Sequence, residues 1–332
     1  MSNANTSKKR RAAAAETQQV EAAAVADVDA VAAADAEAME PFYRIENEGE
    51  IYFQAATVSV DMIKKIFKDM SHFLTDLHFT FSPAREISVF NSNDVTHDMV
   101  SCRITQFDYF QCSRDQPFYF SVKAKDMEQA LAKFPLTAVV SFYISETCLN
   151  AEGGVDKLGL HAVCTETTTT YERKLSTFEP DGRGMSPFEP TYNVERVTTA
   201  MFLNQYRCEI RWMLRNLHET VENLAIMRDA RVLSLCASPN QSCDIESDTN
   251  SSSTKIRMSA ASKLYSFQRF DCEHPLMNRF RLQSLQSFLK CRDLCSEVGL
   301  FLDSELPLIL KFDIPNFGTL CALTPIFHKS DE

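Results

Sequence analysis

The sequence predicts an α+β protein of two similar domains, each with two helices packed on one side of an antiparallel sheet. Short strand patterns alternate with helical patterns over residues 51–314. The apolar pattern of the first half returns in the second half at an offset of 158 residues, from Met127 to Leu285. Residues 176–190 contain three prolines and two glycines without periodicity, which is typical of an interdomain connector.

In the first half, β-rich or alternating runs predict strands at 51–57, 86–90, 99–107, 118–122, 138–145 and 157–164. Helical spacing predicts helices at 60–76 and 125–134. The offset then places Met127, Ala130, Leu131, Val140, Phe142 and Ile144 on Leu285, Phe288, Leu289, Val298, Leu300 and Leu302. We therefore expect an internal duplication, with an N-terminal domain at 42–175 and a C-terminal domain at 191–328.

In the second half, the same reasoning predicts strands at 192–198, 230–238, 255–259, 265–270, 298–303 and 308–314. Helices are expected at 199–217 and 282–291, and the polar residues 239–254 are expected to form an exposed loop. In the helix predicted at 199–217, Arg207, Arg211 and Arg215 recur every four residues along one face. A row of arginines on a chain with a formal net charge of -11 calls for an explanation.

Cations also gather on the other predicted helices. They are Lys64, Lys65 and Lys68 on the first, Lys123, Lys125 and Lys133 on or beside the second, and Arg279, Arg281, Lys290 and Arg292 around the fourth. Exposed helices often carry Lys and Arg only for solubility. If all four helices lie on one side of the sheets, however, cations concentrate there, as on a surface that follows a phosphate backbone without reading sequence.

The first 41 residues differ from the rest of the chain. A basic cluster, Lys8 to Arg11, precedes an alanine-rich acidic segment that lacks large apolar side chains, so a disordered or transiently helical tail is expected. The cluster is either a nuclear-import signal or a solvated charge run. The first reading favours a nuclear protein or one of a viral replication compartment.

Motifs for catalysis and metal binding are missing from the sequence. No P-loop, dinucleotide-binding loop, nucleophile elbow or HExxH pattern occurs, and no second Cys/His pair stands at zinc spacing from Cys291 and Cys295. The eleven cysteines are scattered singly, which favours reduced thiols in an intracellular protein. The longest apolar run, residues 134–144, is too short to cross a membrane. The sequence predicts no enzyme, no cofactor and no metal.

Five segments carry a family resemblance: VSVDMIKKIFKDM at 58–70, FDYFQCSRD at 107–115, TYERKL at 170–175, EIRWMLRNL at 209–217 and SELPLILKFDIPNFGTLCALTPIF at 304–327. In their order and spacing they resemble the DNA sliding clamps of the proliferating cell nuclear antigen family. The resemblance runs from about residue 51 to residue 327. It implies two DNA-clamp domains per chain and a pseudo-sixfold ring of three chains, whose helices line a hole around double-stranded DNA.

The resemblance also implies sites. Lys64, Lys65, Arg215 and Lys290 coincide with basic channel positions of the family, and helical geometry adds Lys68, Lys133, Arg207 and Arg211. Polymerases and other partners would insert a short peptide into a pocket formed by Ser92, Thr96, Met99, Met185, Phe188, Pro307, Leu323, Thr324 and Pro325. Edge strands at 167–175, with Tyr171, Arg173 and Leu175, and at 255–259, with Lys255, Ile256 and Arg257, would join the subunits.

The chain departs from the family pattern at several of these sites. Gln129, Ala132 and Gln283 stand at usual cation positions, and Ser92, Thr96 and Ala322 replace bulkier pocket residues. The expected function is a homotrimeric clamp and polymerase processivity factor for replication and repair, placed on DNA by a clamp loader. The alternatives are one subunit of a heterotrimeric DNA-damage checkpoint clamp and a monomeric viral processivity factor.

Overall fold

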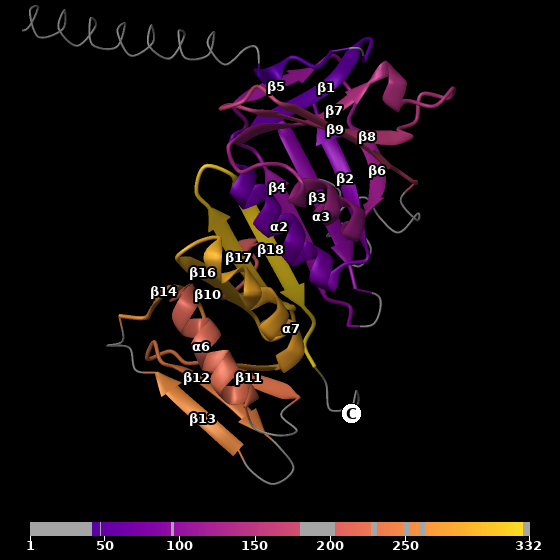
Figure 1. Ribbon diagram of the computed structural model, residues 1–332. Helices are drawn as coiled ribbons and strands as arrows, with labels where there is room; N and C mark the ends of the chain where they lie inside the picture. The colour runs from indigo at the N-terminus through magenta and orange to yellow at the C-terminus, as the bar shows by residue number, and fades with distance from the viewer. Residues whose placement is uncertain are drawn as a thin grey trace, which may run out of the picture. The chain divides into compact units, whose positions relative to one another are not determined.

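A computed structural model describes residues 42–46, 48–93, 96–179, 203–226, 231–248, 253–258 and 263–327. The predicted tail at 1–41, the predicted strand at 192–198 and most of the predicted connector lie outside these residues. The chain divides into a unit of residues 1–46 and a unit of residues 47–332, and the second unit carries all the elements below. That unit is α+β, as predicted, and the described strands pair antiparallel (Figure 1).

Residues 51–178 form the first repeat. Its elements are β1 (Ile51–Thr57), α2 (Val60–Phe73), β2 (Asp76–Ser82), β3 (Glu86–Ser92), β4 (Met99–Ile104), β5 (Tyr109–Cys112), β6 (Phe118–Lys123), α3 (Ala124–Ala132), β7 (Ala138–Ser145), η1 (Glu146–Cys148), β8 (Lys157–Cys164) and β9 (Thr170–Ser176).

Residues 208–327 form the second repeat. Its elements are β10 (Cys208–Met213), α6 (Leu214–Ala225), β11 (Val232–Ala237), β12 (Cys243–Asp248), β13 (Ser253–Met258), β14 (Tyr265–Phe270), β15 (Leu276–Arg281), α7 (Leu282–Phe288), η2 (Leu289–Asp293), β16 (Glu297–Leu302), β17 (Leu308–Ile314) and β18 (Gly318–Thr324).

The strand order is the same in both repeats. The first contains a block β5-β1-β7-β8-β9 and a block β4-β3-β2-β6, and the second contains β14-β10-β16-β17-β18 and β13-β12-β11-β15. One pairing joins the repeats: β18 of the second pairs with β4 of the first, which makes a continuous nine-stranded sheet. β9 and β13, the strands at the equivalent positions, are left at the ends of their sheets.

The core follows the internal repeat that the sequence predicts. All twelve positions matched by the offset are buried, from Met127 with Leu285 to Ile144 with Leu302. In both repeats the helix that starts this stretch follows its strand directly, α3 after β6 and α7 after β15.

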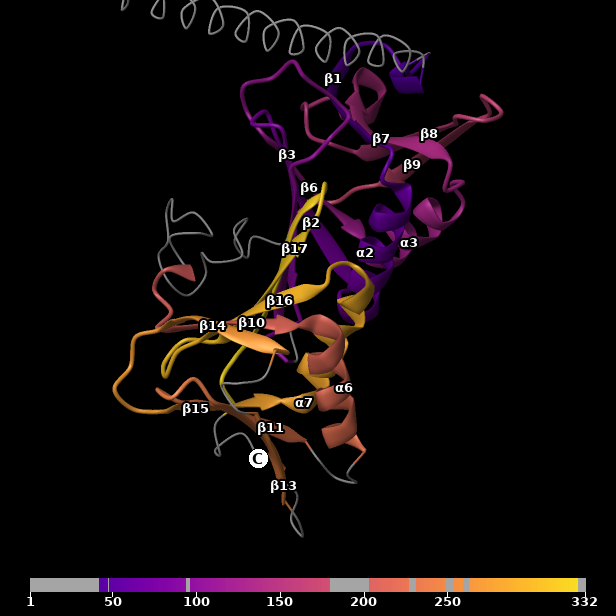
Figure 2. The ribbon, with the colours of Figure 1, turned by 90° about the vertical axis from the view of Figure 1, so that its left-hand side faces the viewer.

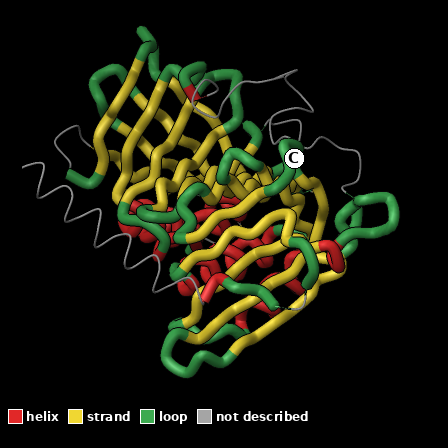
Figure 3. Tube along the Cα trace, turned by 90° about the horizontal axis from the view of Figure 1, so that it is seen from above, coloured by secondary structure: helices red, strands yellow, loops and turns green. Residues whose placement is uncertain are grey.

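The four helices lie on one side of the sheets. Within the repeats α2 contacts α3 and α6 contacts α7, and α2 also contacts η2 across the two repeats. Figure 2 shows the helices together along one side of the strands, and Figure 3 shows them between two groups of strands. The opposite face of each sheet is free of these helices.

The structure overturns the helix predicted at 199–217. Residues 208–213 form strand β10, and the helix begins only at Leu214. Cys208, Ile210 and Trp212 alternate into the core, which is the period of a strand. Its pairing with β14 and β16 supplies the backbone hydrogen bonds that a helix would otherwise make internally.

The polar loop predicted at 239–254 is also wrong, because its centre forms β12 between β11 and β13. Cys243, Ile245 and Ser247 are buried. Other strands had no prediction from the residue pattern: β2, whose start was assigned to the preceding helix, β5, β15 and β18.

Candidate nucleic-acid interface

The helix layer, defined as α2, α3 with its C-terminal cap Lys133, α6, α7 and η2, carries nearly balanced charge. Its eight basic side chains are Lys64, Lys65, Lys68, Lys125, Lys133, Arg215, Lys290 and Arg292. Its seven acidic ones are Asp61, Asp69, Asp126, Glu128, Glu219, Glu222 and Asp293. Against a chain charge of -11, the acids therefore concentrate outside this layer.

One predicted channel residue, Lys64, makes hydrogen bonds within the protein. Its Nζ donates to the carbonyl oxygen of Ala132 at 3.3 Å and to that of Phe134, at the end of α3. The ammonium thus caps a helix C-terminus, where backbone carbonyls lack intrahelical partners and the helix dipole favours a cation. Burial lowers the pKa of this lysine. A phosphate would compete with these carbonyls for Lys64.

Two further predicted residues lie on the helices but have acidic neighbours. Lys65 pairs with Asp61 at 2.7 Å, and the hydrogen bond raises the lysine pKa. Arg215 pairs with Glu219 at 3.2 Å, while its side chain stays 88% exposed. Such exposed pairs contribute little to stability, so both cations can exchange a carboxylate for a phosphate.

Lys68, Lys133 and Lys290 differ from the others. All three are exposed, and none makes an ion pair with a residue in the described part of the chain. They lie on α2, at the C-terminal cap of α3 and on η2, the elements around the contact between α2 and η2. These lysines are the strongest candidates for phosphate contacts.

The structure does not support Arg207 and Arg211 as channel residues. Arg207 precedes β10 and donates to Asp303 through Nε at 2.7 Å and Nη2 at 3.1 Å. Burial would raise the pKa of Asp303, but the hydrogen bonds from Arg207 outweigh it and lower the pKa. Arg211 shares the helix-free face of the sheet with Glu209 and Asp313, at 3.4 Å and 3.3 Å. Both arginines thus pair with carboxylates on or beside the sheet, away from the helix layer.

No known protein-family model matches this chain. Among the described residues, no group of three or more His, Cys, Asp and Glu side chains is arranged to hold a metal ion. None of the described helices is long and apolar enough to cross a membrane. The eleven cysteines are free thiols, and seven of them are buried.

The predicted edge strands do lie at sheet edges. Among the described strands, β9 pairs only with β8, and β13 only with β12. On β13, Lys255 pairs with Asp244 at 3.0 Å and Arg257 pairs with the same carboxylate at 3.1 Å. Charged side chains on an edge strand protect it from indiscriminate pairing.

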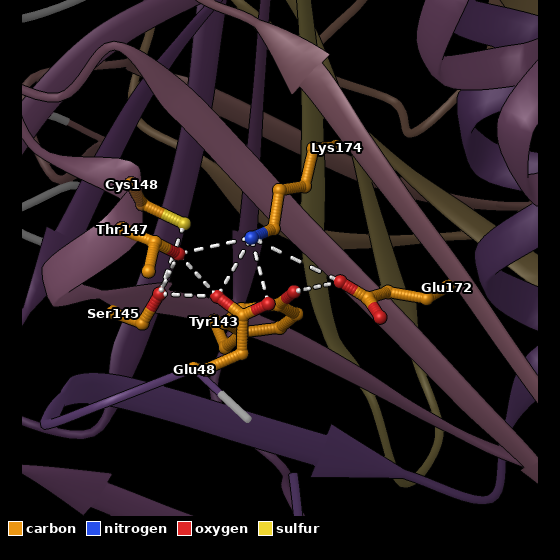
Figure 4. A network of polar contacts seen from close by, with 7 residues as sticks. All are labelled: Glu48, Tyr143, Ser145, Thr147, Cys148, Glu172 and Lys174. Carbon is orange, nitrogen blue, oxygen red and sulfur yellow. Dashed lines mark hydrogen bonds and ion pairs between the residues drawn. The ribbon is translucent and has the colours of Figure 1, made fainter. Parts of the chain in front are cut away.

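A network of hydrogen bonds and ion pairs joins the edge strand β9 to the rest of the first repeat (Figure 4). Lys174 of β9 contacts Glu48 through both carboxylate oxygens, at 2.6 Å and 2.7 Å, and Ser145 donates to the same group at 2.7 Å. Burial alone would raise the pKa of Glu48, but the hydrogen bonds from Lys174, Thr147 and Ser145 lower it to about 2. The sequence does not indicate this network, because Glu48 lies far from its partners in the chain.

Three predicted pocket residues form one cross-strand row. Ser92 of β3 stands opposite Met99 of β4, Met99 opposite Leu323 of β18, and Leu323 opposite Ile309 of β17. Leu323 packs on a buried apolar cluster that includes Ile309 and Phe301. The row therefore crosses the junction between the repeats on the face without helices.

The other pocket residues have different places. The Pro307 carbonyl accepts a hydrogen bond from the Tyr206 hydroxyl at 2.8 Å, and Thr96 lies in the loop before β4. Thr324 follows Leu323, so it faces the other side of β18, and it is fully buried rather than a pocket wall. Pro325 is half-buried, and Met185 and Phe188 lie outside the described residues.

Proposed function

We propose that the chain is a subunit of a ring that encircles duplex DNA and recruits replication and repair enzymes, a sliding clamp that acts in the nucleus or a viral replication compartment. The carrying observation is the pairing of β18 with β4 inside the chain, while β9 and β13, at the equivalent positions, end their sheets in the described part of the chain. A second copy that offers β13 to β9 would extend the same strand pattern head to tail.

The repeat specifies the register of this contact. Following the shared pairings from strand to strand aligns Tyr171 with Leu320 and Ile256 with Cys102. Leu320 stands opposite Cys102 inside the chain, so Tyr171 of one copy should stand opposite Ile256 of the next. The adjacent positions are Glu172 and Lys255, which carry opposite charges.

Charge favours this register over a register shifted by two residues, which would leave each side chain on the same face of the sheet. A shift by two residues in one direction would place Lys255 opposite Lys174, a like-charge pair that destabilises a strand contact, and the same shift in the other direction would place Lys255 opposite Thr170 and lose its pairing with Glu172. A shift by one residue would turn every side chain to the wrong face. The derived register avoids both faults.

The helix layer supports DNA as the object inside the ring. Joining copies of the chain through these edges into a closed ring would bring the helix layers of all copies together. Three unpaired lysines per subunit then provide long-range attraction to phosphates without base recognition. The partly exposed part of the row, Ser92, Met99 and Leu323, stays on the outer face, where a partner peptide can reach it.

The test is assembly of the purified chain. Light scattering should give a mass near three times 37.6 kDa. The double variant Tyr171→Cys/Ile256→Cys should form disulfide-linked oligomers on oxidation, whereas each single variant and the shifted pair Tyr171→Cys/Lys255→Cys should not.

A monomer at every concentration would show that the two edges do not complement each other. The chain would then be either one subunit of a heterotrimeric checkpoint clamp or a ringless processivity factor. Cross-linking by the shifted pair alone would retain the ring and reject the register.

A further inference from the structure

Each repeat ends with a phenylalanine that returns to the edge of its own sheet. In the first, Ser121 and Phe178 exchange backbone hydrogen bonds on β6, at 2.8 Å and 3.1 Å. In the second, the equivalent Phe327 donates to the Arg279 carbonyl on β15 at 2.8 Å. A cation two residues further lies over each ring, Lys123 at 4.9 Å and Arg281 at 5.6 Å from the centroid.

The two edges differ in how their cations are neutralised. Lys123 stands opposite Asp76 and pairs with it at 2.7 Å. Arg281 stands opposite Val232, which occupies the position of Asp76 in the second repeat. Arg279 stands where the first repeat has the buried Ser121. Compared with the first repeat, the second therefore has one additional arginine, Arg279, and lacks a carboxylate at the position that would neutralise Arg281.

No described residue forms an ion pair with Arg279 or Arg281. The acids nearest in register, Asp244, Glu246 and Asp248, lie on β12, separated from β15 by β11. Two strand spacings amount to about 9.6 Å. Asp244 and Glu246 pair instead with Lys255 on β13.

The arginines share their face of β15 with an exposed apolar residue. Met277 alternates with them along the strand and is 67% exposed. Leu276 and Phe280 point to the buried face. An extended segment lying along this edge would meet an apolar side chain and two planar guanidinium groups in order.

We infer that Arg279 and Arg281 bind the carboxylates of an acidic, extended peptide segment of a partner protein. This inference rests on the proposed function, because the same peptide would anchor its apolar part on the row at Leu323. Residues 323–327 connect the two places, and four residues of extended chain span at most about 14 Å. The acidic residues should thus stand about four positions from the apolar anchor.

The chemistry favours carboxylates over other acceptors. A guanidinium offers two parallel N–H donors that match the two oxygens of one carboxylate. The C-terminal segment already occupies the β15 edge at Arg279 through a backbone hydrogen bond, so an extended partner would run alongside that segment, within reach of the two guanidinium groups. Partner choice would then depend on acidic residues that flank the apolar motif.

The experiment is selection of a random peptide display library on the full-length chain and on Arg279→Ala/Arg281→Ala. The matched control is Lys123→Ala/Arg211→Ala, which removes two cations that have acidic partners. The wild type and the control should enrich peptides that combine an apolar anchor with acids about four positions away. The arginine variant should enrich the apolar anchor alone.

An enriched peptide is then synthesised with a fluorescent label and titrated by anisotropy. Its affinity should fall about ten-fold or more when both arginines are replaced, or when its own acids become amides. Circular dichroism and the solution mass of the variant should match the wild type.

Peptides with apolar anchors but no acidic preference would overturn the arginine assignment and leave the clamp function intact. No enriched peptide from either protein would contradict the recruiting role of the proposed function together with this inference. A loss of duplex DNA binding in the arginine variant, without an effect on peptides, would reassign the edge to nucleic acid.

Discussion

Replacing Lys68, Lys133 and Lys290 together by alanine should lower the salt dependence of DNA binding. Each phosphate contact contributes about 0.9 to the slope of log Kobs against log salt. If each lysine of one subunit makes one such contact, the triple variant loses a slope of about 2.7 per subunit. For each subunit in contact with DNA, the wild type should then lose about forty-fold more affinity than the variant between 50 and 200 mM salt.

The assay is fluorescence anisotropy with a short labelled duplex, repeated over a series of salt concentrations. The matched control is Arg207→Ala/Arg211→Ala, since these arginines pair with Asp303 and Asp313 away from the helix layer. The control should keep the wild-type slope. The exposed lysines make no ion pair in the described structure, so the stability of the triple variant should change by less than about 0.5 kcal/mol per site.

An unchanged slope in the triple variant would refute the placement of phosphates on the helix layer. A reduced slope in the arginine control would show that DNA contacts the opposite face of the sheet. The two variants together therefore distinguish the faces, which a single charge reversal on Arg211 would not do.

Three further outcomes follow from the described contacts. Gly159→Ala should destabilise the chain by about 1–3 kcal/mol in urea denaturation, because a Cβ there would lie 2.2 Å from the Tyr143 ring. Lys64→Met should cost about 1 kcal/mol by removing the cap of α3, whereas Lys65→Met should cost less than half of that. Glu48 has a folded-state pKa of about 2 against 4.5, so its stabilisation is complete above pH 4.5 and is lost as the pH falls to 2. Glu48→Gln should remove up to about 3 kcal/mol of that pH dependence, measured by thermal unfolding over this pH range.

The α+β class and the internal repeat could be predicted from the sequence, because both depend on local apolar spacing. The error at residues 199–217 shows the limit of such spacing. Arginines every four residues share a face on a helix, but they also share a face on a strand, since four is even. Ile210 and Trp212, two residues apart and both buried, carried the strand signal.

The candidate DNA site could be predicted only in part, because ion pairs join residues that are distant in the chain. The residues near Arg207 in the sequence do not indicate its ion pair with Asp303, and those near Lys64 do not indicate its hydrogen bonds at the end of α3. The missed strand β12 has a different cause. Its buried Cys243 and Ile245 alternate with acids, but serine and asparagine on both sides resemble a loop.

The two kinds of junction in the proposed ring differ in chemistry. Inside the chain, the pairing of β18 with β4 buries Leu320, Ala322 and Val100, so it separates only when the fold does. Between copies, the equivalent strands would present Arg173 and Lys255, which are exposed in the single chain. Charged edges keep the subunit from pairing with wrong partners and make the contact weaker and salt-dependent. Because a closed ring must open to admit DNA, the weaker contact between copies is where opening would occur, and the apolar junction inside the chain would hold.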